Sequence, residues 1–332
     1  MIVLGIETSC DETSLAIYRS AQQNKKPSIL ASVVSSQINI HSPFGGVVPE
    51  IASRNHIIKL EPLLKELLDK TKLSLKEIDL IGVTNRPGLI GALFTGLAFA
   101  KALGYALKKP VIGINHLLGH TLSAELIYEE LYPPYFSLII SGGHTHLFFV
   151  DNCYNFSLIA KTVDDALGEA FDKVSKMLNL GYPGGPHIEK LASNGNSTSI
   201  PMPIAMENSQ NLSFSGLKTY IKLLVNKNCY KPEDIAASFQ FTVAKTLFKK
   251  IIINRKKHNI KKLIISGGVA ANNYIKNYLR EQLENIELYI PPPRLCTDNA
   301  EMIAYAAFKL FGKRNFIGLA ESAYDKLPSM FY

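Results

Sequence analysis

The stretch Ile139-Ile140-Ser141-Gly142-Gly143 returns unchanged as Ile264-Ile265-Ser266-Gly267-Gly268, and it gives the first indication of the fold. In both places an apolar strand runs into paired glycines, where backbone N–H groups can approach an anion without a Cβ in the way. The second stretch leads into a predicted helix, whose N-terminus favours phosphate or polar purine atoms. A plain strand-to-turn glycine pair would look the same, but the repetition favours binding.

Around these stretches, a larger pattern begins twice with a strand, a polar turn and a returning strand. Residues 2–6 and 14–18 predict the first hairpin, and residues 137–140 and 146–150 predict the second. Strands and helices alternate after each hairpin, as in a duplicated α/β unit with a ligand cleft between the copies. The other expected strands are 29–35, 80–84, 111–114, 262–265 and 286–290, with a turn at 85–88; the expected helices are 51–68, 93–107, 164–179, 233–258, 272–283 and 298–310.

The chain of 332 residues is long enough for about two domains. We expect an N-terminal lobe over residues 1–115, completed by residues 299–332, and a C-terminal lobe over residues 116–298. Residues 182–232 are rich in Gly, Pro, Ser and Asn. They break the second lobe, and we expect a mobile active-site insert there.

The overall composition describes a basic globular protein. Hydrophobic residues make up 47% and charged residues 19%, which excludes a disordered chain. The net charge of +8 permits a polyanionic partner such as RNA or acidic nucleotides. The densest basic patch, residues 255–258 with Lys261 and Lys262, fits RNA binding and a solvated helix end equally well.

The remaining sequence-wide features indicate a cytoplasmic protein. The four cysteines form no CxxC pair, which favours a reducing compartment. The N-terminus lacks a basic region, and Glu7 interrupts its apolar run, so no signal peptide is expected. The longest apolar tract, residues 88–100, is shorter than the ~20 residues of a membrane span.

His116 and His120 form a pair at i, i+4 that lies on one helix face and can share a metal ion. A zinc-protease motif needs Glu directly after the first His, and Leu117 stands there. Two histidines at a helix start are the plainer interpretation. Asp298 would complete a facial set that suits Fe²⁺ or Zn²⁺, although it could equally cap a helix with Glu301 three residues on. Spacing alone does not bring His116 and Asp298 together.

Two further polar segments could carry chemistry. The turn 7–13 offers hydroxyls and amides for phosphate, with Asp11 or Glu12 to hold a cation or orient a nucleophile; an ordinary polar hairpin is the alternative. In the predicted helix 164–179, Asp165, Glu169 and Asp172 share one face and could accept from sugar hydroxyls. A solvated acidic face, with Asp172 paired to the lysine at i+4, is the alternative. The turn 182–186 could place backbone against a ligand.

Taken together, these motifs resemble the bacterial tRNA adenosine threonylcarbamoyltransferase family, earlier labelled O-sialoglycoprotein endopeptidase. The resemblance runs nearly end to end and in order. One departure is visible at Asn85-Arg86, where the family usually has a small residue and then Gly, which puts the shape of that loop in doubt. The matching motifs are Gly5–Thr13, Gly45–Glu50 with Ala52–Arg54, Ser141–Thr145, Gly168–Lys173, Tyr182–Pro186, Phe214–Thr219 and Cys296–Asn299.

The resemblance implies a fold and a set of site residues. The fold is actin/hexokinase-like, an α/β architecture of two duplicated RNase H-like lobes with a central cleft. His116, His120 and Asp298 bind one divalent metal ion, Fe²⁺ or alternatively Zn²⁺. Glu12, with Asp11 beside it, is the acid–base candidate in the phosphate-side turn. The substrate-binding residues are Ile139, Ile140, Ser141, Gly142, Gly143, Asp172, Gly185 and Asn272.

The resemblance also implies a reaction. A threonylcarbamoyl group moves from threonylcarbamoyl-AMP to the exocyclic amine of the adenosine beside the anticodon, in tRNAs reading codons that begin with A, and AMP is released. A shorter protein of similar fold and a small ATPase are the expected partners, and no membrane is involved. The competing hypotheses are a metalloprotease, motivated by the histidine pair, and a sugar or acetate kinase or ATP-binding scaffold of the same fold.

Overall fold

The computed structural model describes residues 1–21, 26–313 and 316–325. The chain divides into two compact units: the first comprises Met1–Glu130 and the segment from Thr297, and the second comprises Leu131–Cys296. This differs from the expected boundary at 115/116, because residues 116–130 pack with the first unit. Part of the expected closing segment, residues 314–315 and 326–332, lies outside the described residues.

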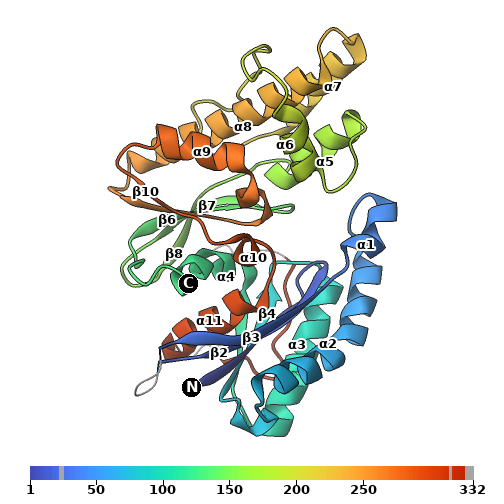
Figure 1. Ribbon diagram of the computed structural model, residues 1–332. Helices are drawn as coiled ribbons and strands as arrows, with labels where there is room; N and C mark the ends of the chain where they lie inside the picture. The colour runs from blue at the N-terminus through green and yellow to red at the C-terminus, as the bar shows by residue number, and fades with distance from the viewer. Residues whose placement is uncertain (22–25, 314–315, 326–332) are drawn as a thin grey trace. The chain divides into compact units, whose positions relative to one another are not determined.

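The first unit is built on a five-stranded sheet in the order β3-β2-β1-β4-β5 (Figure 1). The hairpin partners β1 and β2 are antiparallel, whereas β4 pairs parallel to β1 and β5 parallel to β4. Its strands are β1 (Ile2–Glu7), β2 (Glu12–Arg19), β3 (Ser28–Ser36), β4 (Leu80–Arg86) and β5 (Val111–Asn115). Its helices are α1 (Ile38–His41), α2 (Pro49–Thr71), α3 (Ile90–Leu107), α4 (His116–Leu122) and α11 (Ala300–Leu310), with 3₁₀ turns at Ser42–Phe44, Leu75–Glu77, Ser123–Leu126 and Phe311–Lys313.

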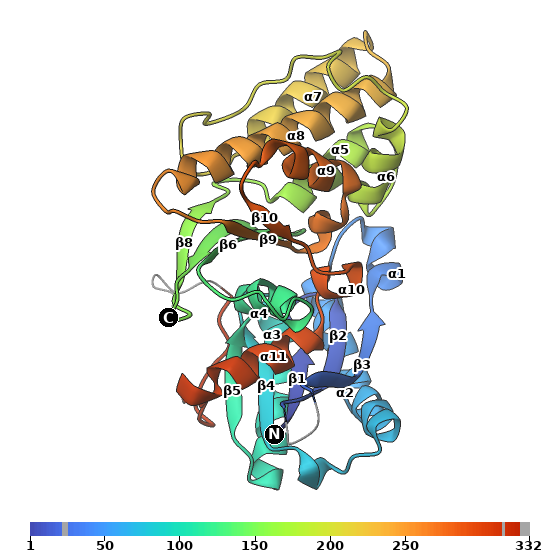
Figure 2. The same ribbon diagram turned by 60° about the vertical axis from the view of Figure 1, so that its left-hand side comes forward.

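Helices cover both faces of this sheet, as Figures 1 and 2 show. On one face, Leu4 and Ile6 of β1 join a buried apolar cluster with residues of α2 and α3. On the other face, Gly5 and Gly82 meet α11. A Cβ on Gly5 would lie 2.3 Å from the carbonyl oxygen of Ala300, so the absence of a side chain permits this contact. The C-terminal segment therefore completes the first unit.

The helix α3 is, among the described residues, the one helix long and apolar enough to cross a membrane by length and composition. It begins at Ile90, three residues before the predicted start, and continues to Leu107, beyond the apolar tract 88–100. Its small residues allow close packing on the sheet: a Cβ on Gly96 would lie 2.2 Å from Thr8 Oγ1, and one on Gly104 2.3 Å from Val111. These are contacts of a helix in a folded core.

The second unit repeats the first. Its five-stranded sheet has the order β10-β9-β6-β7-β8, which matches the first order strand for strand when read from the other edge. The strands are β6 (Tyr135–Ile140), β7 (Thr145–Val150), β8 (Phe156–Lys161), β9 (Lys262–Ser266) and β10 (Glu287–Tyr289). The helices are α5 (Leu167–Met177), α6 (Gly184–Ala192), α7 (Ser215–Lys227), α8 (Pro232–Arg255), α9 (Asn273–Gln282) and α10 (Pro293–Cys296), with a 3₁₀ turn at Gly268–Ala271. The expected α/β duplication is thus confirmed.

The two copies of the Ile-Ile-Ser-Gly-Gly stretch, however, do not occupy equivalent positions in the two units. Both copies lie in the second unit, at the ends of the neighbouring parallel strands β6 and β9, where Ile139 pairs with Ser266. The counterpart of β6 in the first unit is β1, which ends in the turn 7–13. The two glycine turns therefore belong to one sheet edge.

Several local predictions also need correction. Asn85 and Arg86 belong to β4 and not to a turn. The helix predicted from residue 164 begins at Leu167, so Asp164 and Asp165 precede it. The expected insert 182–232 contains two regular helices, α6 and α7. In each case the polar composition of the segment was a poor guide to where the helix or strand begins and ends.

Candidate metal centre and substrate-binding loops

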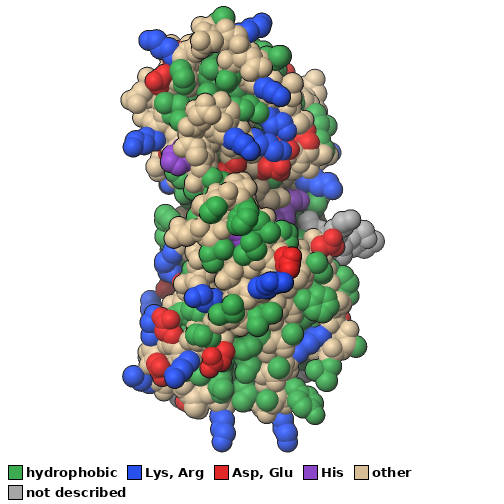
Figure 3. Space-filling view, turned by 90° about the vertical axis from the view of Figure 1, so that its right-hand side faces the viewer, with side chains coloured by type: hydrophobic (Ala, Val, Ile, Leu, Met, Phe, Trp, Pro, Cys, Tyr) green, Lys and Arg blue, Asp and Glu red, His purple; other side chains and the backbone are tan. Residues whose placement is uncertain are grey.

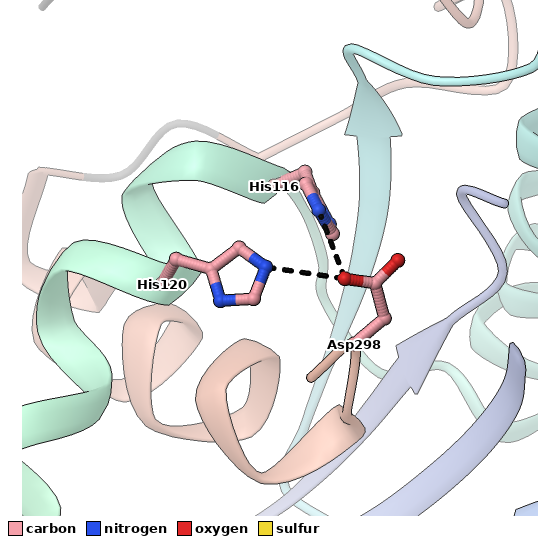
Figure 4. Close-up of side chains that lie close together, drawn as sticks. All are labelled: His116, His120 and Asp298. Carbon is pink, nitrogen blue, oxygen red and sulfur yellow. Dashed lines mark hydrogen bonds and ion pairs between the residues drawn. The ribbon is translucent and has the colours of Figure 1, made fainter. Parts of the chain in front are cut away.

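Three potential metal ligands converge in the first unit. The strand β5 runs directly into α4, whose N-cap Asn115 accepts from the N–H groups of Leu117 and Leu118. This places His116 and His120 one turn apart at the start of the helix, and both are buried. Their Nε2 atoms lie 3.4 Å and 3.2 Å from Asp298 Oδ1 (Figure 4). One candidate ligand atom from each residue lies within 4.8 Å of the other two.

Asp298 reaches this cluster because its neighbour caps the last helix. Asn299, not Asp298, is the N-cap of α11, and its Oδ1 accepts from Met302 N at 3.0 Å. The capping interpretation of Asp298 with Glu301 is therefore wrong. The carboxylate of Asp298 points instead toward the two imidazoles (Figure 4).

A second carboxylate, Glu7, contacts His116 through the ring nitrogen that faces away from Asp298, and it was not among the predicted site residues. Glu7 is fully buried at the end of β1, and its Oε2 lies 3.2 Å from His116 Nδ1. It also accepts from Ser9 N and from Thr84 Oγ1. The available signal was an acid at the end of an otherwise apolar strand.

The electrostatics of this cluster favour a cation. Burial alone would lower the pKa of His116, but Asp298 and Glu7 raise it well above its ordinary value. Burial would raise the pKa of Asp298, yet the two histidines hold it well below its usual range. For His120, burial lowers the pKa, so its imidazole is neutral, as a metal ligand must be.

The residues fit a divalent metal ion. Two imidazoles and one carboxylate form a set that suits Fe²⁺ or Zn²⁺ and leaves coordination positions open. Glu7 behind His116 is the carboxylate that metal-bound histidines commonly contact through the other ring nitrogen. Next to His116, Leu117 is buried and apolar, so the base of a zinc-protease motif is missing.

Asp11, in the turn between β1 and β2, and Glu12, the first residue of β2, lie beside this cluster. Glu12 Oε1 accepts from Ser36 Oγ at 3.3 Å. Burial, followed by the charges of Asp298 and Asp11, raises the pKa of Glu12 to about 9. Glu12 is the acid–base candidate that the family resemblance implies, and a raised pKa is a property that such groups share.

Among the predicted substrate-binding residues of the second unit, Ile139 to Gly143 lie at the end of β6 and Asn272 follows β9, whereas Asp172 lies in α5 and Gly185 in α6. A Cβ on Gly142, Gly143 or Gly185 would meet no atom within 4 Å, so backbone is accessible there. Gly267, with φ of +91°, packs against the carbonyl of Ile140. In α/β folds, ligands bind outside the carboxyl ends of the strands.

The side chains of the other predicted substrate-binding residues are hydrogen-bonded within the protein or buried. Asp172 Oδ1 accepts from Gly184 N at 2.6 Å, and burial raises the pKa of this carboxyl. The side chain of Asn272 caps α9 through Ile275 N and donates to Gln240. The side chains of Ile139 and Ile140 are completely buried, which leaves only their backbone for a ligand.

Two polar motifs of the second unit proved structural. Asp164 accepts from Phe214 N at 2.8 Å and Ser215 N at 3.3 Å, and so holds the N-terminus of α7. Asp165 pairs with Lys173 at 2.8 Å and Lys218 at 2.7 Å. Asp165 therefore does not share a helix face with Glu169 and Asp172 as expected.

The basic patch after α8 is partly structural as well. Arg255 donates to the carbonyl oxygens of Glu284 and Asn285. Lys262 Nζ lies 3.8 Å from the ring centroid of Tyr132 and donates to its carbonyl oxygen. Arg255 and Lys262, two of the six residues of the patch, thus make structural contacts, which favours the interpretation as a helix end.

Comparisons with known proteins place the chain among tRNA-modifying enzymes. A family model described as tRNA N6-adenosine threonylcarbamoyltransferase matches residues 28–305. Proteins of that name from Thermosipho africanus and Thermosipho melanesiensis are 49% and 48% identical. The first match covers 94% of this chain and 95% of the relative, and the second covers 99% of both.

The structural likeness extends beyond these relatives. Full-length HypF, solved in a phosphate- and nucleotide-bound form, aligns with a TM-score of 0.63 at 16% identity, over 97% of this chain and 56% of that chain. At this identity the likeness concerns the fold alone, and the fold is the actin/hexokinase-like α/β class with duplicated lobes.

Proposed function

The chain belongs to the family of tRNA N6-adenosine threonylcarbamoyltransferases, and from this premise we propose that it transfers the threonylcarbamoyl group of threonylcarbamoyl-AMP to the exocyclic amine of the adenosine beside the anticodon. The tRNAs are those reading codons that begin with A. The observation that carries the proposal is the convergence of His116, His120 and Asp298 in a chain matched over almost its whole length.

The reaction needs no nucleophile from the protein. The amine nitrogen forms a bond to the carbamoyl carbon, and the bond from that carbon to the phosphate oxygen breaks. AMP leaves with the electron pair, and the amine loses a proton. Because the donor is already activated and the aromatic amine is a weak nucleophile, positioning contributes more than acid–base help.

In this proposal His116, His120 and Asp298 hold one divalent ion, Fe²⁺ or alternatively Zn²⁺. Bound there, the ion supplies positive charge for the phosphate and for the charge that AMP gains as it leaves. Glu7 orients His116 by accepting from Nδ1, which directs Nε2 toward Asp298. The distances among these four residues support this assignment.

Glu12 is our candidate for the group that takes the amine proton, with Asp11 beside it. A carboxyl of raised pKa is a stronger base than an ordinary one once it is ionised. Burial and the neighbouring charges of Asp298 and Asp11 raise the pKa of Glu12. The bound cation would counter part of this repulsion and return the carboxyl toward its ionised form.

For the adenylate, we assign the loops of the second unit. The backbone from Ile139 to Gly143 and at Gly185 would contact the nucleotide, because no side chain stands over Gly142, Gly143 and Gly185. One oxygen of Asp172 is held by Gly184 N, which leaves the other to accept from a ribose hydroxyl. Asn272, with its amide already engaged, would contribute a further contact at the same edge.

We also propose that the enzyme works with protein partners: a shorter protein of similar fold and a small ATPase. The outer surface of α2 and α3 supports a protein contact. Ser53 of α2 packs against Gly91 of α3, and exposed apolar side chains lie along this line of contact. They are Ile57, Ile58, Ile90 and Phe94, each 48–66% exposed. Figure 3 shows apolar side chains gathered on this face of the first unit, and such patches mark interaction sites.

We infer that the protein acts in the cytoplasm, where tRNA is modified. The packing of α3 against the sheet of the first unit supports this inference. Transfer RNA itself is the remaining partner, and the net charge of +8 suits it.

The decisive experiment supplies purified enzyme and its partners with tRNA and threonylcarbamoyl-AMP. We expect threonylcarbamoyladenosine in the tRNA and an equal amount of AMP. Asp298→Ala should lose bound metal and modification together, whereas Glu125→Gln, a buried acid outside the cluster, should retain both. Absence of modified nucleoside with the wild-type enzyme and all partners would refute the proposal.

A further inference from the structure

A buried histidine of α2 fastens the turn between β1 and β2. His56 has no exposed surface, and both of its ring nitrogens are engaged. Nε2 lies 2.9 Å from the carbonyl oxygen of Cys10, and Nδ1 lies 2.8 Å from Thr13 Oγ1. A carbonyl oxygen only accepts, so Nε2 carries the hydrogen, and Nδ1 accepts from the hydroxyl of Thr13.

The positions of these two contacts give His56 its significance. Cys10 directly precedes Asp11, and Thr13 directly follows Glu12. One imidazole ring therefore binds the residues on both sides of the two carboxylates. A third contact comes from outside α2, because Gln37 N donates to the carbonyl oxygen of Asp11 at 3.0 Å.

The turn needs such a restraint because Glu12 interacts there with two further acids, Asp11 and Asp298. As the proposed acceptor of the amine proton, Glu12 must be ionised, and in that form both neighbours repel it. The hydrogen bonds of His56 to the flanking residues oppose this repulsion. Burial keeps His56 neutral by lowering its pKa, so its contribution is directional hydrogen bonding and not charge.

We propose that His56 is a positioning residue for catalysis: it fixes Asp11 and Glu12 beside the metal centre by holding the residues that flank them. The inference rests on the proposed function, since it assigns these carboxylates a part in the transfer. The hydrogen bonds of His56 go to Cys10 and Thr13 and not to His116, His120 or Asp298, so it acts through the turn.

The test compares His56→Leu, which removes both hydrogen bonds, with His56→Gln and His56→Asn, each of which can restore one. We measure kcat and KM for threonylcarbamoyl-AMP, bound metal and Tm in the complete assay with tRNA and partners. His56→Leu should lower kcat roughly ten- to hundredfold, the range expected for a displaced catalytic group. Its KM should stay within about twofold and its metal content should be unchanged. His56→Gln, whose amide nitrogen can reach the Cys10 carbonyl, should recover most of kcat.

A matched control separates positioning from stability. Leu60 lies one turn further along the same face of α2 and is buried in the core. Leu60→Val should lower Tm and leave kcat within about twofold of the wild-type value, because the change removes apolar packing from the core cluster and neither hydrogen bond to the turn.

The outcomes are distinguishable. A folded His56→Leu enzyme with full metal content and wild-type kcat would overturn the inference while the active wild type upholds the proposed function. If His56→Leu does not fold, the two amide variants and Thr13→Val decide: wild-type kcat in all three contradicts the inference. An inactive wild type would refute the proposed function itself.

Discussion

At the scale of single residues, the candidate metal centre has a buried carboxylate, Glu7, beside the three candidate ligands. Glu7 contacts His116 on the side away from Asp298, and it replaces solvent as the acceptor for Nδ1. A buried imidazole with a fixed partner has one orientation and one tautomer. The orientation and the tautomer of the His116 ring are therefore fixed before any cation binds.

Replacing Glu7 by Gln should weaken metal binding about 10- to 100-fold without removing a ligand, as for other partners of metal-bound histidines. The amide retains an acceptor but loses the charge that favours the bound form. Competition with a chelator of known affinity measures the change. Glu125→Gln is the control, because Glu125 is a buried acid that pairs with Lys309 at 3.0 Å elsewhere in the unit. Equal affinity in the Glu7 variant and the wild type would contradict the assigned role.

Glu12 predicts a pH dependence of stability in the metal-free protein. Its pKa rises from an ordinary value of 4.5 to about 9 on folding. A raised pKa contributes stability that is full below pH 4.5 and is lost as pH rises toward 9. Glu12→Gln should therefore have a Tm that exceeds the wild-type Tm increasingly across this window.

The measurement is a series of thermal melts in chelator between pH 5 and 9 for both proteins. A Tm difference that stays constant over that range would show that Glu12 ionises freely in the folded state. Added metal should reduce the difference, because a cation favours the ionised carboxyl.

At the scale of elements, glycines decide how the loops of the second unit meet. A Cβ on Gly168 would lie 2.7 Å from both Gly142 Cα and the carbonyl oxygen of Ser141. The N-terminus of α5 is also bonded there, since Gly168 N donates to Ser141 O at 3.0 Å. The first turn of α5 and the glycine turn after β6 therefore pack directly against each other.

Gly168→Ala should therefore cost about 1–3 kcal/mol of unfolding free energy, as overpacking does, and should weaken adenylate binding. Denaturant unfolding and nucleotide titration measure the two effects. Gly216→Ala is the matched control, because a Cβ there meets nothing within 4 Å and the residue lies in α7. It should be neutral or slightly stabilising; equal stability loss in both variants would refute the packing argument.

The ends of the helices were the part of the fold that the sequence predicted least accurately. Short apolar runs bounded by polar turns predicted β1, β2, β6 and β7 well, because strands that are buried on both faces are apolar along almost their whole length. Helix starts were less certain, since several polar residues competed for each cap. Asp298 and Asn299 are both good caps, and only the packed structure shows that Asn299 takes the position.

At the scale of the whole molecule, topology brings together what spacing could not. Asp298 follows His120 by 178 residues, and the whole second unit lies between them in sequence. The sequence offered the histidine pair and Asp298 as a candidate third ligand, but spacing could not bring them together, and their shared site was implied only by the resemblance. The strand orders of the two sheets, by contrast, follow from the duplicated pattern of hairpin and crossover.

Because the metal centre joins α4 to the segment from Thr297, a bound cation should stabilise the first unit as a whole. A ligand at a hundred times its Kd adds about 2.7 kcal/mol, which corresponds to roughly 5–10 °C in Tm for a unit of this size. We expect chelator to lower Tm by that amount and added Fe²⁺ or Zn²⁺ to restore it. Asp298→Ala should show no response, and an identical response in this variant would place the stabilising ion elsewhere.

The contact of β1 with α11 has a consequence for synthesis on the ribosome. The bare backbone of Gly5 rests on Ala300 and Ala304, so one of the earliest strands to emerge is covered by nearly the last helix. Residues 131–296 are translated in between. One face of the first sheet therefore stays without α11 while the second unit is being synthesised. We expect this sheet to become protease-resistant in ribosome-bound chains only once residue 310 has left the exit tunnel.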